Sequence, residues 1–379
     1  LTTGRWYRLA HLVMRRPGVV ALATIAGLLL VAAPFTRIEF GLNDDRVLPA
    51  DAEPRQVLDA VRTEFSAIES GAISVVYEDP ASVSGDEVGA HARELQSLPG
   101  VARIDQRDGW LRVVPAVEPV SNEGRELVGA IRDLPAPSPV VVGGDAARLV
   151  DNTDHVTDRL PWVLGGMITA TILMLGILFR SVLVPLKAIV LNLLSLSAMF
   201  GAIVWIFQDG RFAGVLGYTP TGLTDVTVPT LMFCVAFGLS MDYEVFLLSR
   251  IREEYVRTDD PVDSIALGLQ RTGGVLSASA ILMSVVFTAF ATGSVTQLKV
   301  LGIGITLAVL LDAFVVRSLL VPSLMRLAGR ANWWPTAHRG GGAHDDDRAV
   351  DLRGVDDHGD RRGGDTGDPA GALLPAGDT

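Results

Sequence analysis

Six long apolar runs dominate the sequence and limit what the chain can fold into. A helix that crosses a hydrocarbon core about 30 Å thick needs roughly 20 apolar residues, and each run has about that length. In lipid every backbone amide must find its partner within the protein, so each run is expected to be a membrane-spanning helix. The sequence therefore predicts a membrane protein, an α-helical bundle of six transmembrane helices. The runs cover residues 17–36, 160–179, 188–208, 226–249, 272–298 and 300–325.

The Lys and Arg residues of the short connections predict the orientation of the bundle, because cytoplasmic loops are enriched in both. They gather before the first run, between the second and third runs, and between the fourth and fifth runs. The opposite side carries only Arg211 and Lys299. We therefore expect a multi-pass protein of the cell membrane with both termini cytoplasmic and with residues 1–16 as a cytoplasmic N-terminal segment. The basic residues on the predicted cytoplasmic side are Arg5, Arg8, Arg15, Arg16, Arg180, Lys187, Arg250, Arg252, Arg257 and Arg271.

The segment between the first two runs, residues 37–159, is large enough to be a folded extracytoplasmic domain. Its pattern predicts the order strand, helix, strand, strand, helix, strand, which is the α+β, ferredoxin-like βαββαβ arrangement. Asp108 and Gly109 separate two β-rich runs and indicate a hairpin turn. A further helix is expected at residues 54–70. The strands are expected at residues 72–77, 101–106, 110–115 and 139–142, and the two helices at 85–98 and 122–134.

Composition argues against several other functions. With 43 acidic and 32 basic residues the net charge is -11, so the chain has no basic surface for nucleic acid, which is not expected as a partner. The single cysteine, Cys234, can build neither a disulfide framework nor a cysteine metal site. No phosphate-binding GxxxxGK[ST] loop occurs, and His11, His91 and His155 are scattered. We therefore expect no enzyme activity, no cofactor and no metal.

The composition changes after Trp334, where Gly, Asp and Arg replace the aliphatic residues. Such a segment cannot bury enough apolar surface to fold, so residues 336–379 are predicted to be a disordered cytoplasmic tail. His344 precedes three aspartates, but their spacing fixes no geometry, and a solvated tail is favoured over a metal site. Helices two to six of the bundle are accordingly expected within residues 160–335.

Charged residues inside the predicted spans are the candidate functional residues, because a central Asp or Arg costs roughly 2.5 to 3.5 kcal/mol even on the lowest scales. Asp242 lies in the fourth run, where it is expected to be buried, and it shares a helix face with Gly238 and Ser249, which permit close helix approach. A buried carboxylate could take up and release a proton, and the hydroxyl of Tyr243 could relay it. The alternative is that Asp242 is the static partner of a basic residue on another helix.

Three further charged residues lie in the spans. Glu244 is about two turns from Arg250 and is expected to extend towards the membrane interface. Asp312 and Arg317 are five positions apart, which is about 140° around an α-helix, so they are not expected to share a face. Each is then expected to find its partner on another helix. The two residues are candidates for a secondary proton relay or for a structural interhelical ion pair.

The segment Phe237–Tyr255, which reads FGLSMDYEVFLLSRIREEY, closely resembles the fourth-helix signature of the MMPL transporters in the resistance-nodulation-division (RND) superfamily. Residues 179–195, 311–326 and 332–335 resemble the same family's second-to-third and sixth helices. The resemblance extends from Arg5 to Pro335. It implies a twelve-helix protein made of two similar halves, of which this sequence supplies one, and the Ser-Met-Asp-Tyr-Glu form followed by a polar tail is similar to the C-terminal half.

The resemblance also implies a function, namely export of lipids or other hydrophobic compounds across the cytoplasmic membrane, driven by the proton motive force. It implies that residues 37–159 are a porter domain and that Asp242 and Tyr243 are proton-relay residues facing an Asp-Tyr pair of the other half. The expected partners are protons, a lipid or hydrophobic small molecule, and a second half-transporter or homo-oligomer. The alternatives are a non-transporting membrane scaffold, a sterol-sensing-type receptor, or an inactive truncated half-transporter.

Overall fold

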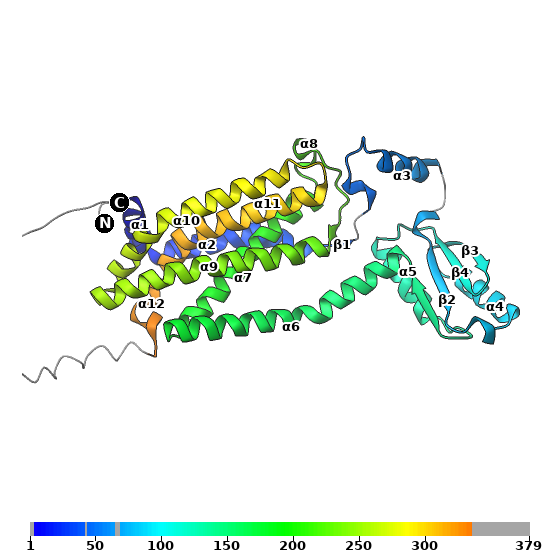
Figure 1. The fold of residues 1–379 in the computed structure, drawn as a ribbon, viewed down its shortest axis with the longest axis horizontal. Coiled ribbons are helices and arrows are strands. Elements are labelled where there is room, and N and C mark those ends of the chain that lie inside the picture. The colour runs from blue at the N-terminus through cyan, green and yellow to red at the C-terminus, as the bar shows by residue number, and fades with distance from the viewer. Residues whose placement is uncertain (1–3, 42–43, 65–68, 336–379) are drawn as a thin grey trace, which may run out of the picture. The chain divides into compact units, whose positions relative to one another are not determined.

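The computed structural model describes residues 4–41, 44–64 and 69–335. The predicted disordered tail therefore lies outside the described residues. Among the described residues, six helices are long and apolar enough to cross a membrane, and Figure 1 shows them gathered in a bundle. The predicted membrane helical bundle is thereby confirmed. The six spans are Pro17–Arg37, Asp145–Phe179, Leu183–Gln208, Thr227–Thr258, Pro261–Ala291 and Thr296–Trp333.

Three of the spans are uninterrupted α-helices, and the other three change helix type along their length. The first ends in a 3₁₀ turn, the third ends in a π-helical segment, and the sixth contains a π-helical segment at its centre. The segments in chain order are α2 (Pro17–Ala32), η1 (Ala33–Arg37), α6 (Asp145–Phe179), α7 (Leu183–Ile203), η5 (Val204–Gln208), α9 (Thr227–Thr258), α10 (Pro261–Ala291), α11 (Thr296–Leu310), η6 (Leu311–Leu320), α12 (Val321–Ala328) and η7 (Gly329–Trp333).

Two of the spans begin more than ten residues earlier than their apolar runs. Helix α6 begins at Asp145 rather than at residue 160, and Pro161 lies inside it. Its first turns are polar, but they are anchored because Ala146 and Ala147 are buried in the core of the α+β region. Helix α10 begins at Pro261, where the Asp260 carboxylate accepts hydrogen bonds from the first free backbone amides. Hydropathy detects only the part of a helix that lies in lipid, so it misses such extensions.

An amphipathic helix, α1 (Arg5–Arg15), precedes the first span and was not predicted. Its inner face buries Ala10, Val13 and Met14 against the bundle. The chain then breaks at Arg16, whose backbone is not helical, and Pro17 occupies the first position of α2, where its missing amide costs nothing. Helix α1 therefore forms part of the bundle, where it packs mainly against α10.

The segment between α2 and α6 contains a four-stranded antiparallel sheet in the order β3-β4-β2-β5. Two helices connect its strands, and Ser84 and Glu87 form a capping box at the start of the first. The elements are β2 (Ile73–Tyr77), α4 (Gly85–Gln96), β3 (Val101–Arg107), β4 (Trp110–Pro115), α5 (Asn122–Asp133) and β5 (Val140–Gly143). The remaining elements are β1 (Phe40–Gly41), which pairs in parallel with β6 (Thr224–Asp225), η2 (Asp45–Val47), α3 (Glu53–Glu64), η3 (Glu69–Gly71), η4 (Pro80–Ser82) and α8 (Ala213–Leu216).

One face of this sheet forms a core of its own. Side chains alternate along a strand, and Ile73, Val75 and Tyr77 of β2 are all almost fully buried. They pack with residues of β4 and α5, including Leu111 and Val128. The α+β region therefore has the inward apolar face that an independently packed layer requires.

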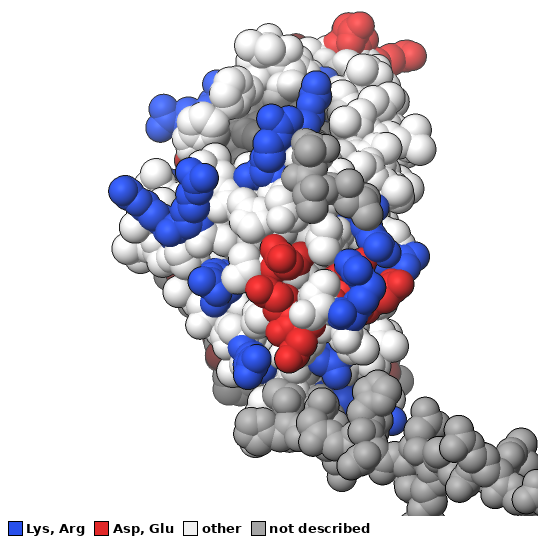
Figure 2. Space-filling view, turned by 90° about the vertical axis from the view of Figure 1, so that its left-hand side faces the viewer, with Lys and Arg blue, Asp and Glu red and all other residues white. Residues whose placement is uncertain are grey.

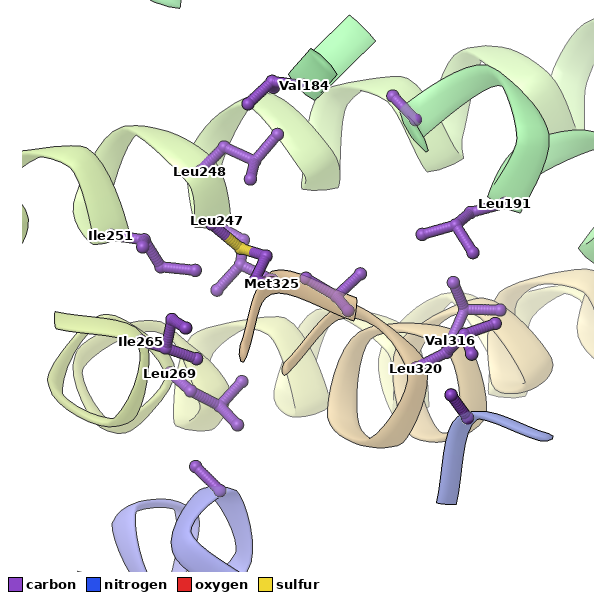
Figure 3. Close-up of a cluster of buried hydrophobic side chains, with 14 of the residues drawn as sticks. Val184, Leu191, Leu247, Leu248, Ile251, Ile265, Leu269, Val316, Leu320 and Met325 are labelled. Atoms are coloured by element: carbon purple, nitrogen blue, oxygen red, sulfur yellow. The ribbon is translucent and has the colours of Figure 1, made fainter. Parts of the chain in front are cut away.

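The bundle has a second core, which Figure 3 shows in close-up. The labelled side chains come from α7, α9, α10, η6 and α12, and α1, α2 and α6 add others. Because lipid is as apolar as these side chains, close packing holds them together rather than removal from water. Small residues permit this: a Cβ at Gly201 of α7 would collide with the Val31 carbonyl of α2, and one at Gly268 of α10 would collide with Ile251 of α9. The labelled core residues are Val184, Leu191, Leu247, Leu248, Ile251, Ile265, Leu269, Val316, Leu320 and Met325.

Candidate functional site

A cluster of polar side chains is buried inside the helix bundle. Asn192 comes from α7, Ser240 and Glu244 from α9, and Asp312 and Arg317 from η6, and each is less than a tenth exposed. Buried charges are costly unless they are paired. The cluster is therefore the part of the membrane bundle in which function, rather than packing, best explains the choice of residues.

Asp312 and Arg317 form a direct ion pair. The Arg317 Nε donates to Asp312 Oδ2 at 2.8 Å, and both side chains are buried. The prediction that these two residues do not share a face is therefore wrong. It assumed α-helical geometry, whereas Leu311–Leu320 is a π-helix, whose hydrogen bonds join residues five positions apart. The Ser318 hydroxyl shows the same spacing, because it donates to the Ala313 carbonyl at 3.0 Å.

Arg317 also ties the sixth span to the other helices of the cluster. Its Nη2 donates to the backbone carbonyl of Ser240 and approaches the Ser240 hydroxyl at 3.4 Å. The Ser240 hydroxyl in turn donates to Asn192 Oδ1. Among the described residues, Arg317 Nη1 and Asn192 Nδ2 are buried without a hydrogen-bond partner. The network therefore joins three helices and keeps two free donors inside the bundle.

Tyr243 lies beside the ion pair. The Arg317 guanidinium carbon is 5.5 Å from the centre of the Tyr243 ring, within the range of a cation–π contact. The structure therefore brings together three of the four residues that the sequence singled out: Tyr243, Asp312 and Arg317.

Asp242 does not join them, because its side chain is exposed on the surface of α9. The expectation that Asp242 is buried is wrong for the described chain. Successive residues of an α-helix point about 100° apart, and Ser240 and Glu244 face the cluster, so Asp242 faces outward. It lies on an exposed stripe with Cys234 and Gly238. Within the described part of the chain, Asp242 forms no ion pair. The alternative, that Asp242 is the static partner of a basic residue, is therefore not supported there.

Glu244 is the site residue that sequence reasoning undervalued. It is 7% exposed and does not reach the interface, so the expectation for it is also wrong. Among the described residues it has no hydrogen bond and no ion pair. Its position two residues after Asp242 places it on the opposite face of α9. This spacing of two residues could have indicated the role of Glu244 from the sequence, because only one of two such carboxylates can face the bundle.

Two small cavities adjoin Glu244. One has a volume of ≈ 10 Å³ and lies between Glu244 and Lys187 of α7. The other, also ≈ 10 Å³, lies between Glu244, Asn192 and the Asp312–Arg317 pair. Each has room for about one water molecule. The Lys187 ammonium donates to Asn332 Oδ1. Glu244 is thus a buried carboxyl between two cationic groups, with a small cavity on each side.

A larger cavity of ≈ 60 Å³ lies at the other end of the bundle. Its lining combines apolar side chains, among them Ile203, Phe207 and Val228, with polar ones from Arg46, Asp225, Gln297 and four threonines. The Arg46 guanidinium is held by ion pairs with Asp44 at 2.6 Å and with Glu118 at 3.2 Å. This combination suits a molecule that has both an apolar and a polar part.

Comparison with known proteins places the fold and the cluster in a family. The model of the MMPL family matches residues 113–345. The membrane protein SCO6666 of Streptomyces coelicolor is 40% identical over 332 residues, which cover 86% of this chain and 46% of that protein. Membrane protein YdfJ of Bacillus subtilis is 31% identical over 334 residues, covering 85% and 46%.

A third relative carries a functional name. The trehalose monomycolate exporter MmpL3 of Mycolicibacterium smegmatis is 28% identical over 351 residues, covering 87% of this chain and 35% of the exporter. The chain therefore spans about half or less of the length of these relatives. The matched region contains the whole buried cluster and all but the first of the six spans. By this match the chain belongs to the MMPL family of RND-type membrane proteins.

Proposed function

We propose that this chain is one half of a twelve-helix transporter that exports lipids or other hydrophobic compounds across the cytoplasmic membrane, driven by the proton motive force. The observation that carries the proposal is the buried cluster, in which an unpaired carboxyl, Glu244, adjoins the Asp312–Arg317 ion pair. A scaffold or receptor gains nothing from such a costly arrangement. The MmpL3 relative named as a trehalose monomycolate exporter supports lipid as the substrate class.

The proton relay in this proposal begins at Asp242 and Tyr243. Asp242 faces away from its own bundle, and a carboxylate at that depth cannot remain in lipid without a large cost. A second six-helix half covers it, in keeping with the length of the relatives. The small residues Cys234 and Gly238 on the same stripe allow that half to approach closely. Tyr243 then connects the interface with Arg317, which its ring contacts.

Protonation acts on the balance of charge in the cluster. With both carboxyls ionised, Asp312 and Glu244 oppose the positive charges of Arg317 and Lys187. A proton on Glu244 leaves one positive charge uncompensated in a medium of low dielectric constant. The bundle then favours a second arrangement in which that charge is better solvated or paired, and this change of population is the step that drives transport.

The α+β region supplies the outer part of the path. Its strand and helix order is that of a ferredoxin-like porter domain, with residues 37–159 outside the membrane. The ≈ 60 Å³ cavity between the segment at Arg46 and the outer ends of α7, α9 and α11 is proposed as an early point on the route of a hydrophobic compound.

The test is transport by inverted membrane vesicles from cells that produce the protein, so that any companion half is present. The probe is a fluorescent NBD-labelled phospholipid, and its movement between leaflets is measured with and without an imposed pH gradient. We expect gradient-dependent movement that Asp242→Asn reduces at least about tenfold. The control is Glu253→Gln, which neutralises an exposed carboxylate on the same helix and should leave movement unchanged. Equal movement in the wild type and in Asp242→Asn would refute the relay.

A further inference from the structure

The outward face of α1 carries a stripe of basic residues without carboxylate partners. Arg5, Arg8 and Arg15 are exposed, and Leu12 between them is 62% exposed. At 100° per residue these four side chains lie within an arc of about 80°. Within the described part of the chain, none of the three guanidinium groups forms an ion pair or a hydrogen bond. The stripe therefore combines free positive charge with an apolar side chain on one narrow face.

Most other arginines at the same end of the bundle are paired. Arg250 contacts Glu253 at 2.7 Å, and Arg257 and Arg271 share the buried carboxylate of Glu254. Figure 2 looks onto this end and shows Lys and Arg side chains around acidic ones. The arginines of α1 differ from this pattern, so their charge is available to a partner outside the chain.

The inner contacts of α1 fix which face it turns outward. The Tyr7 amide donates to Gln270 Oε1 at 2.9 Å, and the Tyr7 hydroxyl donates to Asp263 at 3.5 Å. Trp6 lies against Gly273, where a Cβ would collide with the indole ring. Asp263 faces α1 from this inner side, where it also lies 3.8 Å from His11 Nε2. These contacts therefore hold α1 in one rotational orientation, with the stripe on its outward face.

The stripe continues along the chain onto the lipid-facing surface of the first span. Helix α2 begins at Pro17, and Val19 and Leu22 are 65% and 71% exposed. The apolar face of α1 packs on the bundle, so the outward stripe instead sets arginines around an exposed leucine directly beside a membrane span. Anionic headgroups attract basic side chains at that position. A soluble acidic protein or a nucleic acid would match the charge but would leave Leu12 and this apolar continuation unexplained.

We propose that α1 is an interfacial helix whose outward stripe, Arg5, Arg8, Leu12 and Arg15, binds the headgroups of anionic phospholipids in the leaflet next to it. The guanidinium groups contact the lipid phosphates, since their planar donors match phosphate geometry. The Leu12 side chain inserts at the level of the acyl chains. This site is independent of the transport proposal, because it requires neither a proton relay nor a second half.

The experiment reports which lipid lies next to α1. A bimane fluorophore is attached at Leu12→Cys in a Cys234→Ser background, and the purified protein is placed in vesicles of phosphatidylcholine with phosphatidylglycerol. Quenching by brominated phosphatidylglycerol is compared with quenching by brominated phosphatidylcholine. Each basic residue near an anionic surface contributes about fivefold in binding. We expect a preference for phosphatidylglycerol of about fivefold or more, which falls towards one at 1 M salt, where the Debye length is only about 3 Å.

Two sets of variants separate the stripe from net charge. Replacing Arg5, Arg8 and Arg15 together with Gln should remove the preference, whereas replacing them with Lys should retain most of it. The matched control replaces three exposed, unpaired arginines elsewhere with Gln: Arg93, Arg107 and Arg211. It changes the net charge equally and should leave the preference intact. A wild type without preference, a Gln variant that keeps it, or a control that loses it would each overturn the proposal.

Discussion

Arg317 provides a quantitative test of the buried cluster. Arg317→Met keeps most of the side-chain volume but leaves Asp312 without its partner, and it also removes the donor to the Ser240 carbonyl. Asp312 is 4% exposed, and Glu244 nearby carries no compensating charge. Removing one member of a buried ion pair costs about 3 to 5 kcal/mol. We expect that loss in the free energy of unfolding of the reconstituted protein.

The double variant then shows whether the ion pair is the cause. Asp312→Asn together with Arg317→Met leaves no stranded charge, so it should be more stable than the sum of the single effects implies, by about 2 kcal/mol. The measurement is unfolding by SDS in mixed micelles, followed by circular dichroism. The control cycle uses Arg250 and Glu253, a pair 2.7 Å apart and about half exposed, for which about 0.5 kcal/mol is expected. Additive effects at Asp312 and Arg317, or a cost below about 1 kcal/mol for Arg317→Met, would refute the reasoning.

Two further predictions follow from other parts of the chain. Burial lowers the pKa of His91, whose Nδ1 contacts the Tyr77 hydroxyl at 2.8 Å. Below about pH 6.5 His91 binds a proton in the unfolded chain but resists doing so in the folded α+β region. The stability of that region should therefore decrease as the pH is lowered, by at most about 1.4 kcal/mol per pH unit. Hydrogen exchange of β2 and α4 between pH 8 and 5 measures this, and exchange protection that does not change with pH would contradict it. Cys234, on the exposed stripe with Asp242, should be shielded from maleimide reagents in native membranes and react after the assembly is dissociated in detergent. Equal labelling in both states would argue against a covered interface.

The sequence could predict the membrane spans because the bilayer imposes a length that apolar runs must match. It could not predict the start of α6 at Asp145, since the polar first turns are held by the sheet core rather than by lipid. The sequence also could not show which of the two carboxylates, Asp242 or Glu244, faces the bundle. Within its apolar run, helix α9 carries hydrophobic residues on all sides, so the pattern does not show which side faces the bundle. Only the packing of the neighbouring helices decides.

The Asp312–Arg317 pair was missed for a different reason. A rule of 100° per residue holds only for α-helical geometry, and hydropathy gives no sign of a π-helical segment. The spacing of five between an acid and a base in an apolar run was the available hint, because that spacing permits pairing only if the helix is wound more loosely.

The π-helical segment also sets the rotational phase of everything that follows it. Suppose that Leu311–Leu320 rewound as an ordinary α-helix with no residue removed. An α-helix turns further per residue than the wider π-helix, so the chain beyond would rotate about the helix axis. Asn332, which accepts a hydrogen bond from Lys187, and Trp333, which stacks on Tyr255, would then point elsewhere. The number of residues in the last span is thus set more by the rotational orientation that its final turns require than by the thickness of the bilayer.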